Sequence, residues 1–307
     1  MSERHKVTII ATFTLVVSLV LSVACAKVVD RLRGEATLQE VLYIPSANTV
    51  KHLSLGYRGL LADIYWTRVV QYFGGKHHLK SKQFQLLNPL LQITTTLDPK
   101  LIVAYEFGSI FLAQQPPEGA GDPQAAAELV KKGIEQNPDN WRLYYSLGFI
   151  YWQELHDPKS ASDAFLRGSQ IPGAQVWMKI MAAALAQHAD EHQTARMLWT
   201  NIYQNSDDKL IKANAVKRLT ALRVDEEVSF LQGYIERYRQ QNGHYPTSLS
   251  ELQTAGWVRR IPMDPLGYPY LIRDGRIQVA HPDELPFITK GLPPGMEASD
   301  IPKIPSN

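Results

Sequence analysis

The stretch WRLYYSLGFIYWQELHDPKSASDAFLRGSQIP, residues 141–172, decides the fold of this chain. Its first half is an aromatic-rich helical pattern that carries Gly148, and its second half is a helical pattern that carries Phe165. After a shift of 34 residues, Ala182 takes the place of Gly148 and Trp199 takes the place of Phe165. Small residues align with small ones and large aromatic residues with large aromatic ones, which predicts a repeated pair of packed helices.

The repeat resembles the tetratricopeptide repeat, whose unit is a helix pair of 34 residues. The resemblance covers most of residues 53–222, and the spacing from Gly108 to Gly148 is longer because PPEGAG, residues 116–121, is inserted in a loop. It implies a mostly α fold in which residues 51–225 form a TPR-like helical solenoid. Such an architecture binds protein partners and does not by itself indicate a chemical reaction.

An uncharged run of 20 residues, 7–26, lies near the amino terminus and follows Arg4 and Lys6. At about 1.5 Å per residue, a helix of this length spans a hydrocarbon core of about 30 Å. We expect residues 1–27 to be an uncleaved signal anchor whose short amino-terminal tail stays in the cytoplasm. The chain would then be a single-pass protein of the bacterial inner membrane, with a connector at residues 28–50 and its bulk in the periplasm.

Cys25 is the only cysteine, so neither an intrachain disulfide nor a cysteine-based zinc site can form. A second interpretation of the amino terminus is a cleaved signal peptide with lipid attached to Cys25. Ala24 suits the position before such a cysteine, whereas Ser22 stands where an aliphatic residue is usual. Without lipid, Cys25 is a small apolar residue of a membrane helix. Both targeting interpretations predict a membrane-tethered body outside the cytoplasm.

Several helix boundaries can be predicted from glycines and capping residues. Two helices are expected over residues 53–73 and 81–97, with Gly74 and Gly75 ending the first, and a long helix is expected over residues 226–242. An acidic or amide residue followed by proline predicts a helix start at four places: Asp98-Pro99, Asp122-Pro123, Asn137-Pro138 and Asp157-Pro158.

The character of the chain changes at NGHYPTSLSELQTAGWVRRIPMDPLGYPYLI, residues 242–272. Over residues 234–279 the chain resembles the carboxy-terminal part of type II secretion pseudopilins. The resemblance rests on Asn242, Gly243, Tyr245, Pro246, Leu249, Leu252, Gly256, Pro262, Asp264, Pro265, Gly267, Pro269 and Tyr270. It implies a helix followed by a loop and a small sheet. Asp274-Gly275 is a favoured two-residue turn, which predicts a hairpin between residues 268–273 and 276–279.

The chain departs from pseudopilins in two respects. Their acidic, glycine-rich loop that can hold calcium is missing after Val279, and the predicted membrane helix is separated from this region by the repeats. We therefore expect residues 226–280 to be a small carboxy-terminal α+β module rather than a pilus subunit. Residues 281–307 are rich in proline and are predicted to form an extended tail that can wrap another surface.

The sequence His188-Ala189-Asp190-Glu191-His192 matches the H-x-x-E-H pattern of one class of zinc proteases. That chemistry needs both histidines on one face of an uninterrupted helix, with the glutamate between them as base. The repeat register instead places these residues at the turn between two helices, so we expect no zinc site. A zinc-dependent hydrolase that uses His188, Glu191 and His192 is the alternative from a different class of function.

Other chemistry has little support in the sequence. The chain has no G-x-S-x-G elbow, no Walker A sequence and no G-x-G-x-x-G loop, so we expect neither an enzyme nor a bound cofactor. A formal net charge of +2 gives no argument for a nucleic-acid partner. The basic cluster between Lys209 and Arg223 is typical of a solvated helix, so no nucleic acid is expected to bind there.

A partner-binding groove is better supported. In tetratricopeptide arrays the first helix of each unit lines the concave surface, and carrying over the ligand-contacting positions predicts a groove of six principal residues: Tyr105, Arg142, Tyr145, Phe149, Trp152 and Lys179. Large aromatic residues flanked by cations suit an extended peptide with apolar side chains and an acidic group. The alternative is that these aromatic rings pack against a neighbouring helix.

These features together predict a membrane-anchored scaffold or adaptor that binds protein partners in a bacterial envelope assembly. The carboxy-terminal resemblance points to an assembly related to secretion or pili. An accessory structural subunit of a membrane enzyme or transporter complex is an alternative of the same broad kind.

Overall fold

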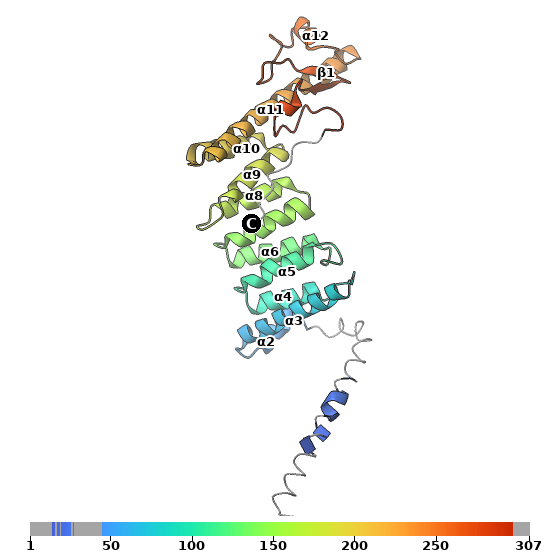
Figure 1. Ribbon diagram of the computed structural model, residues 1–307, viewed down its shortest axis with the longest axis vertical. Helices are drawn as coiled ribbons and strands as arrows, with labels where there is room; N and C mark the ends of the chain where they lie inside the picture. Colours follow the sequence, from blue (N-terminus) through green and yellow to red (C-terminus); the bar gives the residue numbers. More distant parts are fainter. Residues whose placement is uncertain (1–13, 16, 19, 26, 28–44, 297–307) are drawn as a thin grey trace, which may run out of the picture. The chain divides into compact units, whose positions relative to one another are not determined.

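The part of the chain that the computed structural model describes is mostly helical (Figure 1). It comprises residues 14–15, 17–18, 20–25, 27 and 45–296. Within this part, no helix combines the length and the apolar character that crossing a membrane requires. The predicted anchor and connector, residues 1–50, lie largely outside the described residues. Contacts between Cα atoms divide the chain into two compact units: Met1–Pro99 with Gln115–Ala120, and Lys100–Gln114 with Gly121–Asn307.

Within residues 45–99, the first unit contains three helices: α2 (Ala47–Leu53), α3 (Arg58–His78) and α4 (Leu87–Leu97). Helix α4 packs against both others, and Val50, Ala62, Ile93 and Leu97 form the buried core between them.

The predicted end of the first helix at Gly74-Gly75 was wrong, because α3 runs on to His78. A glycine inside a helix costs about 1 kcal/mol relative to alanine. Packing beyond the glycines offsets this cost, since the ring of Phe73 lies 5.8 Å from that of His77 and 5.9 Å from that of Phe84.

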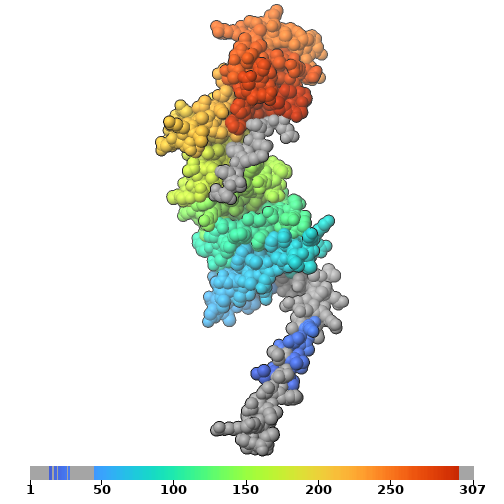
Figure 2. Space-filling view, in the orientation of Figure 1, coloured from blue at the N-terminus to red at the C-terminus, as the bar shows by residue number. Residues whose placement is uncertain are grey.

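The second unit begins with seven α-helices, each of which packs against the next. They are α5 (Ile102–Ala113), α6 (Pro123–Gln136), α7 (Trp141–Phe149), α8 (Pro158–Ser169), α9 (Trp177–His188), α10 (His192–Asn205) and α11 (Lys209–Asn242). Helix α7 continues into η3 (Ile150–Glu154), one turn of π-helix. In the space-filling view the atoms of this part of the chain follow one another from teal through green and yellow to orange (Figure 2). Side chains of α8, α9, α10 and α11 share one buried core.

Two glycines show why the repeat needs small residues at fixed places. A Cβ atom on Gly148 of α7 would lie 2.8 Å from the ring of Phe165 on α8. A Cβ atom on Gly133 of α6 would lie 2.8 Å from the ring of Tyr105 on α5. Such distances are well inside van der Waals contact, so only glycine lets an aromatic ring of the paired helix pack directly on the backbone.

The large aromatic residues of the repeat lie in one buried core. Phe165 and Trp199 are 0% and 1% exposed and belong to the same cluster as Ala182 and Ala195. The large residues that align in the 34-residue repeat are therefore buried in a common core.

The four acceptor–proline pairs play two different roles. Asp122 and Asp157 cap α6 and α8 as predicted, each accepting a hydrogen bond of 3.0 Å from a backbone N–H in the first turn. The prediction was wrong for the other two. Asp98 ends α4, and Asn137 ends α6 by donating its amide N–H to the Gly133 carbonyl at 3.0 Å. Helix α7 is capped instead by Asn140, whose side-chain oxygen accepts a hydrogen bond of 3.0 Å from the backbone N–H of Arg142.

Helix α11 is longer than predicted, since it starts at Lys209 and has no break before Glu226. Its buried side chains continue through this junction, with Leu222 and Val228 in two different clusters. The predicted end is confirmed: Gly243 follows α11 with φ of +76°, a conformation that glycine adopts without strain.

The remaining elements of the second unit are short: α12 (Leu249–Thr254), β1 (Leu271–Arg273), β2 (Arg276–Gln278) and η4 (Pro282–Glu284). Strands β1 and β2 pair antiparallel, with Arg273 opposite Arg276. Asp274 and Gly275 between them have φ of +51° and +70°, as a type I′ turn requires. The predicted hairpin is confirmed.

Residues 281–296 do not form the extended tail that was predicted, because part of this segment is buried. Leu285 and Ile288 are 5% and 2% exposed and share a core with Leu231 and Ile235 of α11. This part of the predicted tail therefore packs on its own module, while residues 297–307 lie outside the described residues.

Candidate groove between helices α5 and α7

A groove of about 420 Å³ opens between α5 and α7. Its walls are mostly apolar, and Gln175 and Trp177, before and at the start of α9, also line it. It is lined by Glu106, Phe107, Ile110, Trp141, Arg142, Tyr145, Ser146, Gln175 and Trp177. A concave surface of this size suits one or two side chains of an extended ligand.

One wall of the groove comes from α7. Leu143 and Leu147 bury the opposite face of this helix, which leaves Arg142 and Tyr145 directed to the groove side. The prediction for these two residues is consistent with the geometry. The Tyr145 ring is held by aromatic neighbours, with its centroid 6.4 Å from that of Trp141 and 5.4 Å from that of Trp177.

The other wall comes from a face of α5 that the repeat register did not predict. Phe107 and Ile110 line the groove with 48% and 45% of their surface exposed. Tyr105, the predicted groove residue, is 0% exposed, so that prediction was wrong. Its ring packs on Gly133 of α6, so the face of α5 that carries Tyr105 is buried between helices. A different face of α5 therefore lines the groove.

Phe149, Trp152 and Lys179 are also outside the residues that line the groove. Phe149 is half-buried, with its ring 5.3 Å from Phe165 and 6.2 Å from Trp177. The Trp152 ring lies 5.6 Å from that of Phe149. Phe149 follows the alternative interpretation, because its ring contacts α8 and α9. Trp152 packs against Phe149 and against the core that these helices share. Lys179 is half-buried and donates to the side-chain oxygen of Asn201 on α10 at 2.8 Å.

The groove contains one acidic side chain, that of Glu106. Burial raises the pKa of this carboxyl, while the positive charge of Arg142 acts in the opposite direction. Its Oε1 atom is buried and has no hydrogen-bond donor among the described residues. Burial also raises the pKa of Tyr145, so its hydroxyl stays protonated at neutral pH. The site therefore offers aromatic rings, a desolvated carboxylate and an exposed guanidinium.

The H-x-x-E-H residues do not share one helix. His188 is the last residue of α9 and His192 the first of α10, and Asp190 between them has φ of +57°. Glu191 accepts a hydrogen bond from Lys159 on α8. The uninterrupted helix that a zinc site of this class needs is therefore not formed here. No group of three or more potential ligand residues within the described part of the chain could hold a metal ion.

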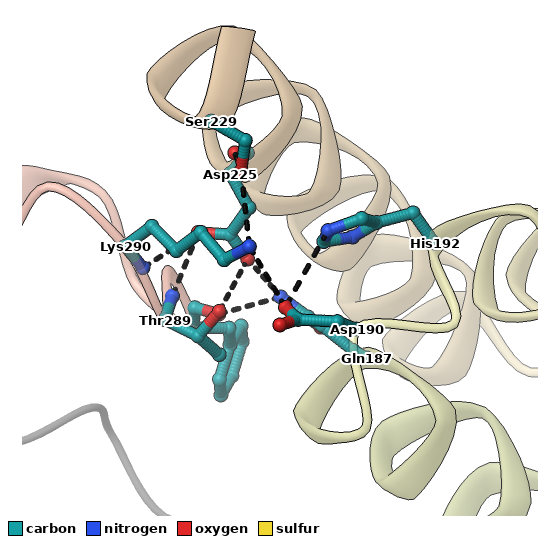
Figure 3. A network of polar contacts seen from close by, with 8 residues as sticks. Gln187, Asp190, His192, Asp225, Ser229, Thr289 and Lys290 are labelled. Atoms are coloured by element: carbon teal, nitrogen blue, oxygen red, sulfur yellow. Dashed lines mark hydrogen bonds and ion pairs between the residues drawn. The ribbon is translucent and has the colours of Figure 1, made fainter. Parts of the chain in front are cut away.

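The same turn belongs instead to a polar network around Asp225 of α11 (Figure 3). Asp225 is 0% exposed and accepts hydrogen bonds from the backbone N–H groups of Thr289 and Lys290 at 2.8 and 2.9 Å. The Thr289 hydroxyl and the Gln187 amide donate to its other oxygen at 2.9 Å each. Lys290 Nζ then pairs with Asp190 at 2.9 Å. This network fastens residues 287–290 to α9 and α11.

Arg218 of α11 lies beside this network and is 1% exposed. Its guanidinium carbon is 3.8 Å from the ring centroid of Phe287 and 5.5 Å from that of Trp199. None of its three guanidinium nitrogens has a hydrogen-bond acceptor within the described part of the chain. Burial lowers the pKa of Arg218 to about 10. Arg218 belongs to the basic cluster that was predicted to be solvated, and for this residue the prediction was wrong.

Sequence reasoning missed Glu106, Phe107, Ile110, Trp141 and Trp177 as groove residues. No periodic signal was available for Phe107 and Ile110, because nearly every residue of α5 is apolar. Cys25 is exposed, and its predicted lipid modification stays a prediction. No family model, curated protein or solved structure matches this chain.

Proposed function

We propose that this chain is a TPR-like helical-repeat scaffold that binds an extended segment of a partner protein in the groove between α5 and α7. The observation that carries the proposal is the pair of exposed apolar side chains, Phe107 and Ile110, facing the aromatic side chains of Tyr145 and Trp177. Exposed apolar side chains that line a concave surface favour burial by a partner, and ordered aromatic rings supply contact area at low entropic cost.

The helical solenoid is part of the proposal. It is supported by the 34-residue spacing of Phe165 and Trp199, by the packing of each helix from α5 to α11 on the next, and by the close contacts at Gly133 and Gly148. A stack of this kind holds its groove on helices rather than loops, so the walls are ordered before the partner arrives.

The cellular setting is proposed from the sequence. Residues 7–26 would tether the scaffold to the inner membrane, with the repeats in the periplasm. The resemblance of residues 234–279 to pseudopilins suggests a partner from a secretion or pilus assembly. An accessory role in another membrane complex would use the same groove.

The test is site-specific cross-linking in membranes. A photoreactive amino acid at Phe107 or Ile110 should capture a defined partner, and Tyr145→Ala combined with Phe107→Ala should reduce the capture at Ile110 at least tenfold. A photoreactive residue at Leu210 of α11, which is 81% exposed and does not line the groove, is the control. Equal capture by the groove variant and the wild type would reject the groove as the binding site.

A further inference from the structure

We infer that the partner segment presents a basic side chain, lysine or arginine, to Glu106 in the α5–α7 groove. This inference rests on the proposed function, because it names the chemistry of the segment that the groove binds. It differs from the expectation drawn from sequence, in which two cations suited an acidic ligand.

The first observation is the state of the Glu106 carboxylate. It lines the groove, burial raises its pKa, and its Oε1 atom is buried without a hydrogen-bond donor among the described residues. A partly desolvated carboxylate has lost some of its hydration, so a charged donor that reaches it forms a strong hydrogen bond. Because Glu106 lines the groove, a donor that enters the groove can approach its carboxyl group.

The second observation is the set of aromatic rings that line the same groove as Glu106. Trp141, Tyr145 and Trp177 line the same groove, and the Tyr145 centroid lies 6.4 and 5.4 Å from the other two. The faces of tryptophan and tyrosine rings attract cations, and the attraction grows when water is excluded. Phe107 and Ile110 provide an apolar wall for the methylene groups of a lysine or arginine stem.

The competing charge is Arg142, the one cation among the described residues that line the groove. Its side chain is exposed, and its guanidinium carbon lies 5.6 Å from the centroid of the Trp141 ring. No ion pair within 4.0 Å joins it to Glu106 in the described structure. An exposed guanidinium is already solvated and gains little from an acidic ligand, whereas the desolvated Glu106 gains more from a basic one.

The experiment selects random nonapeptides displayed on phage against the full-length wild-type chain in detergent, and in parallel against Glu106→Gln. Glu128→Gln, which changes an exposed glutamate of α6, is the matched control. The wild type and the control should enrich peptides with lysine or arginine at one fixed position between apolar residues. The Glu106→Gln protein should lose that preference.

A selected peptide is then synthesised with lysine, or with norleucine in its place. Norleucine keeps the four-carbon chain and removes the amino group. The wild type should bind the lysine peptide at least tenfold more tightly than the norleucine peptide. The Glu106→Gln protein should bind the two peptides with nearly equal affinity. Binding of both peptides should weaken when Phe107 and Ile110 are replaced by alanine, which places the site in the groove.

The outcomes separate the two proposals. Enrichment of acidic or purely apolar peptides that depend on Phe107 and Ile110, or an equal affinity for lysine and norleucine peptides, overturns the inference and leaves the groove as a binding site. Failure to enrich any peptide that depends on these two residues rejects the groove, and the inference falls with it.

Discussion

Replacing Arg218 with methionine should stabilise the second unit, although it removes a residue that contacts two aromatic rings. The guanidinium is 1% exposed and has no hydrogen-bond acceptor in the described part of the chain. A fall of its pKa from 12.5 to about 10 corresponds to about 3 kcal/mol of penalty on the charged form, at about 1.4 kcal/mol per pKa unit. This penalty is present at neutral pH, because the residue is charged in both the folded and unfolded states.

The rings of Phe287 and Trp199 offset part of that penalty. A desolvated cation–π contact contributes about 2 kcal/mol, and the contact with Phe287 at 3.8 Å is the closer of the two. Methionine keeps most of the buried volume and can pack its sulfur against both rings. We therefore expect Arg218→Met to gain about 1 kcal/mol. Arg218→Ala should lose about 2 kcal/mol, because it also leaves a cavity.

The measurement is hydrogen exchange of the full-length chain, read by mass spectrometry on peptides from α10, α11 and residues 285–291. This readout reports local opening and does not require the two units to unfold together. In Arg218→Met these amides should exchange about fivefold more slowly, which is about 1 kcal/mol at 25 °C.

Arg239 of the same helix provides a control, because its replacement by methionine should destabilise the fold instead of stabilising it. It is exposed, lies 4.7 Å from the Tyr245 ring centroid and donates to the Tyr245 hydroxyl at 2.7 Å. Arg239→Met should lose about 0.5 kcal/mol, because an exposed cation has almost no desolvation penalty to remove. If Arg218→Met exchanges faster than the wild type, the guanidinium stabilises the fold and the reasoning about its burial is refuted.

Three further outcomes can be measured on the purified chain. Asp225→Asn should destabilise the segment from residue 287 to residue 290 by about 3 kcal/mol, because one amide oxygen cannot accept the four hydrogen bonds that the two carboxylate oxygens accept. The amides of this segment should then exchange hydrogen faster than in the wild type. Gly148→Ala should lower stability by about 1–2 kcal/mol in thermal melts, since overpacking against Phe165 outweighs the gain in helix propensity; an unchanged melting temperature would contradict the close contact. Asp157→Ala should cost about 1 kcal/mol at pH 7 by loss of the α8 cap. The hydrogen bonds with Ser160 lower the pKa of Asp157 below 3.8, so this contribution is present above pH 3.8 and lost as the pH falls through the lowered value. Denaturant titrations should therefore separate variant and wild type at pH 7 and converge in strong acid.

The groove shows where sequence reasoning succeeds and where it stops. Arg142 and Tyr145 line the groove on the side of α7 that the repeat register indicated, because α7 has a clear apolar face that includes Leu143 and Leu147. Their contact with a partner stays a prediction. On α5 nearly every residue is apolar, so periodicity does not distinguish the core face from the groove face. Which face of α5 is buried depends on the Tyr105 ring, which packs over Gly133 of α6. This is a contact between two helices.

The sequence by itself determined the local structure of this protein. The 34-residue spacing indicated paired helices, Asp122 and Asp157 marked two helix starts, and Asp274-Gly275 marked a hairpin turn, because each of these signals depends on neighbouring backbone geometry. Only the tertiary structure decided which side chains are accessible. Arg218 looks like a solvated cation in the sequence, yet Phe287, 69 positions further along the chain, covers it. Burial of this kind is decided by segments that are distant in sequence, and no local pattern encodes it.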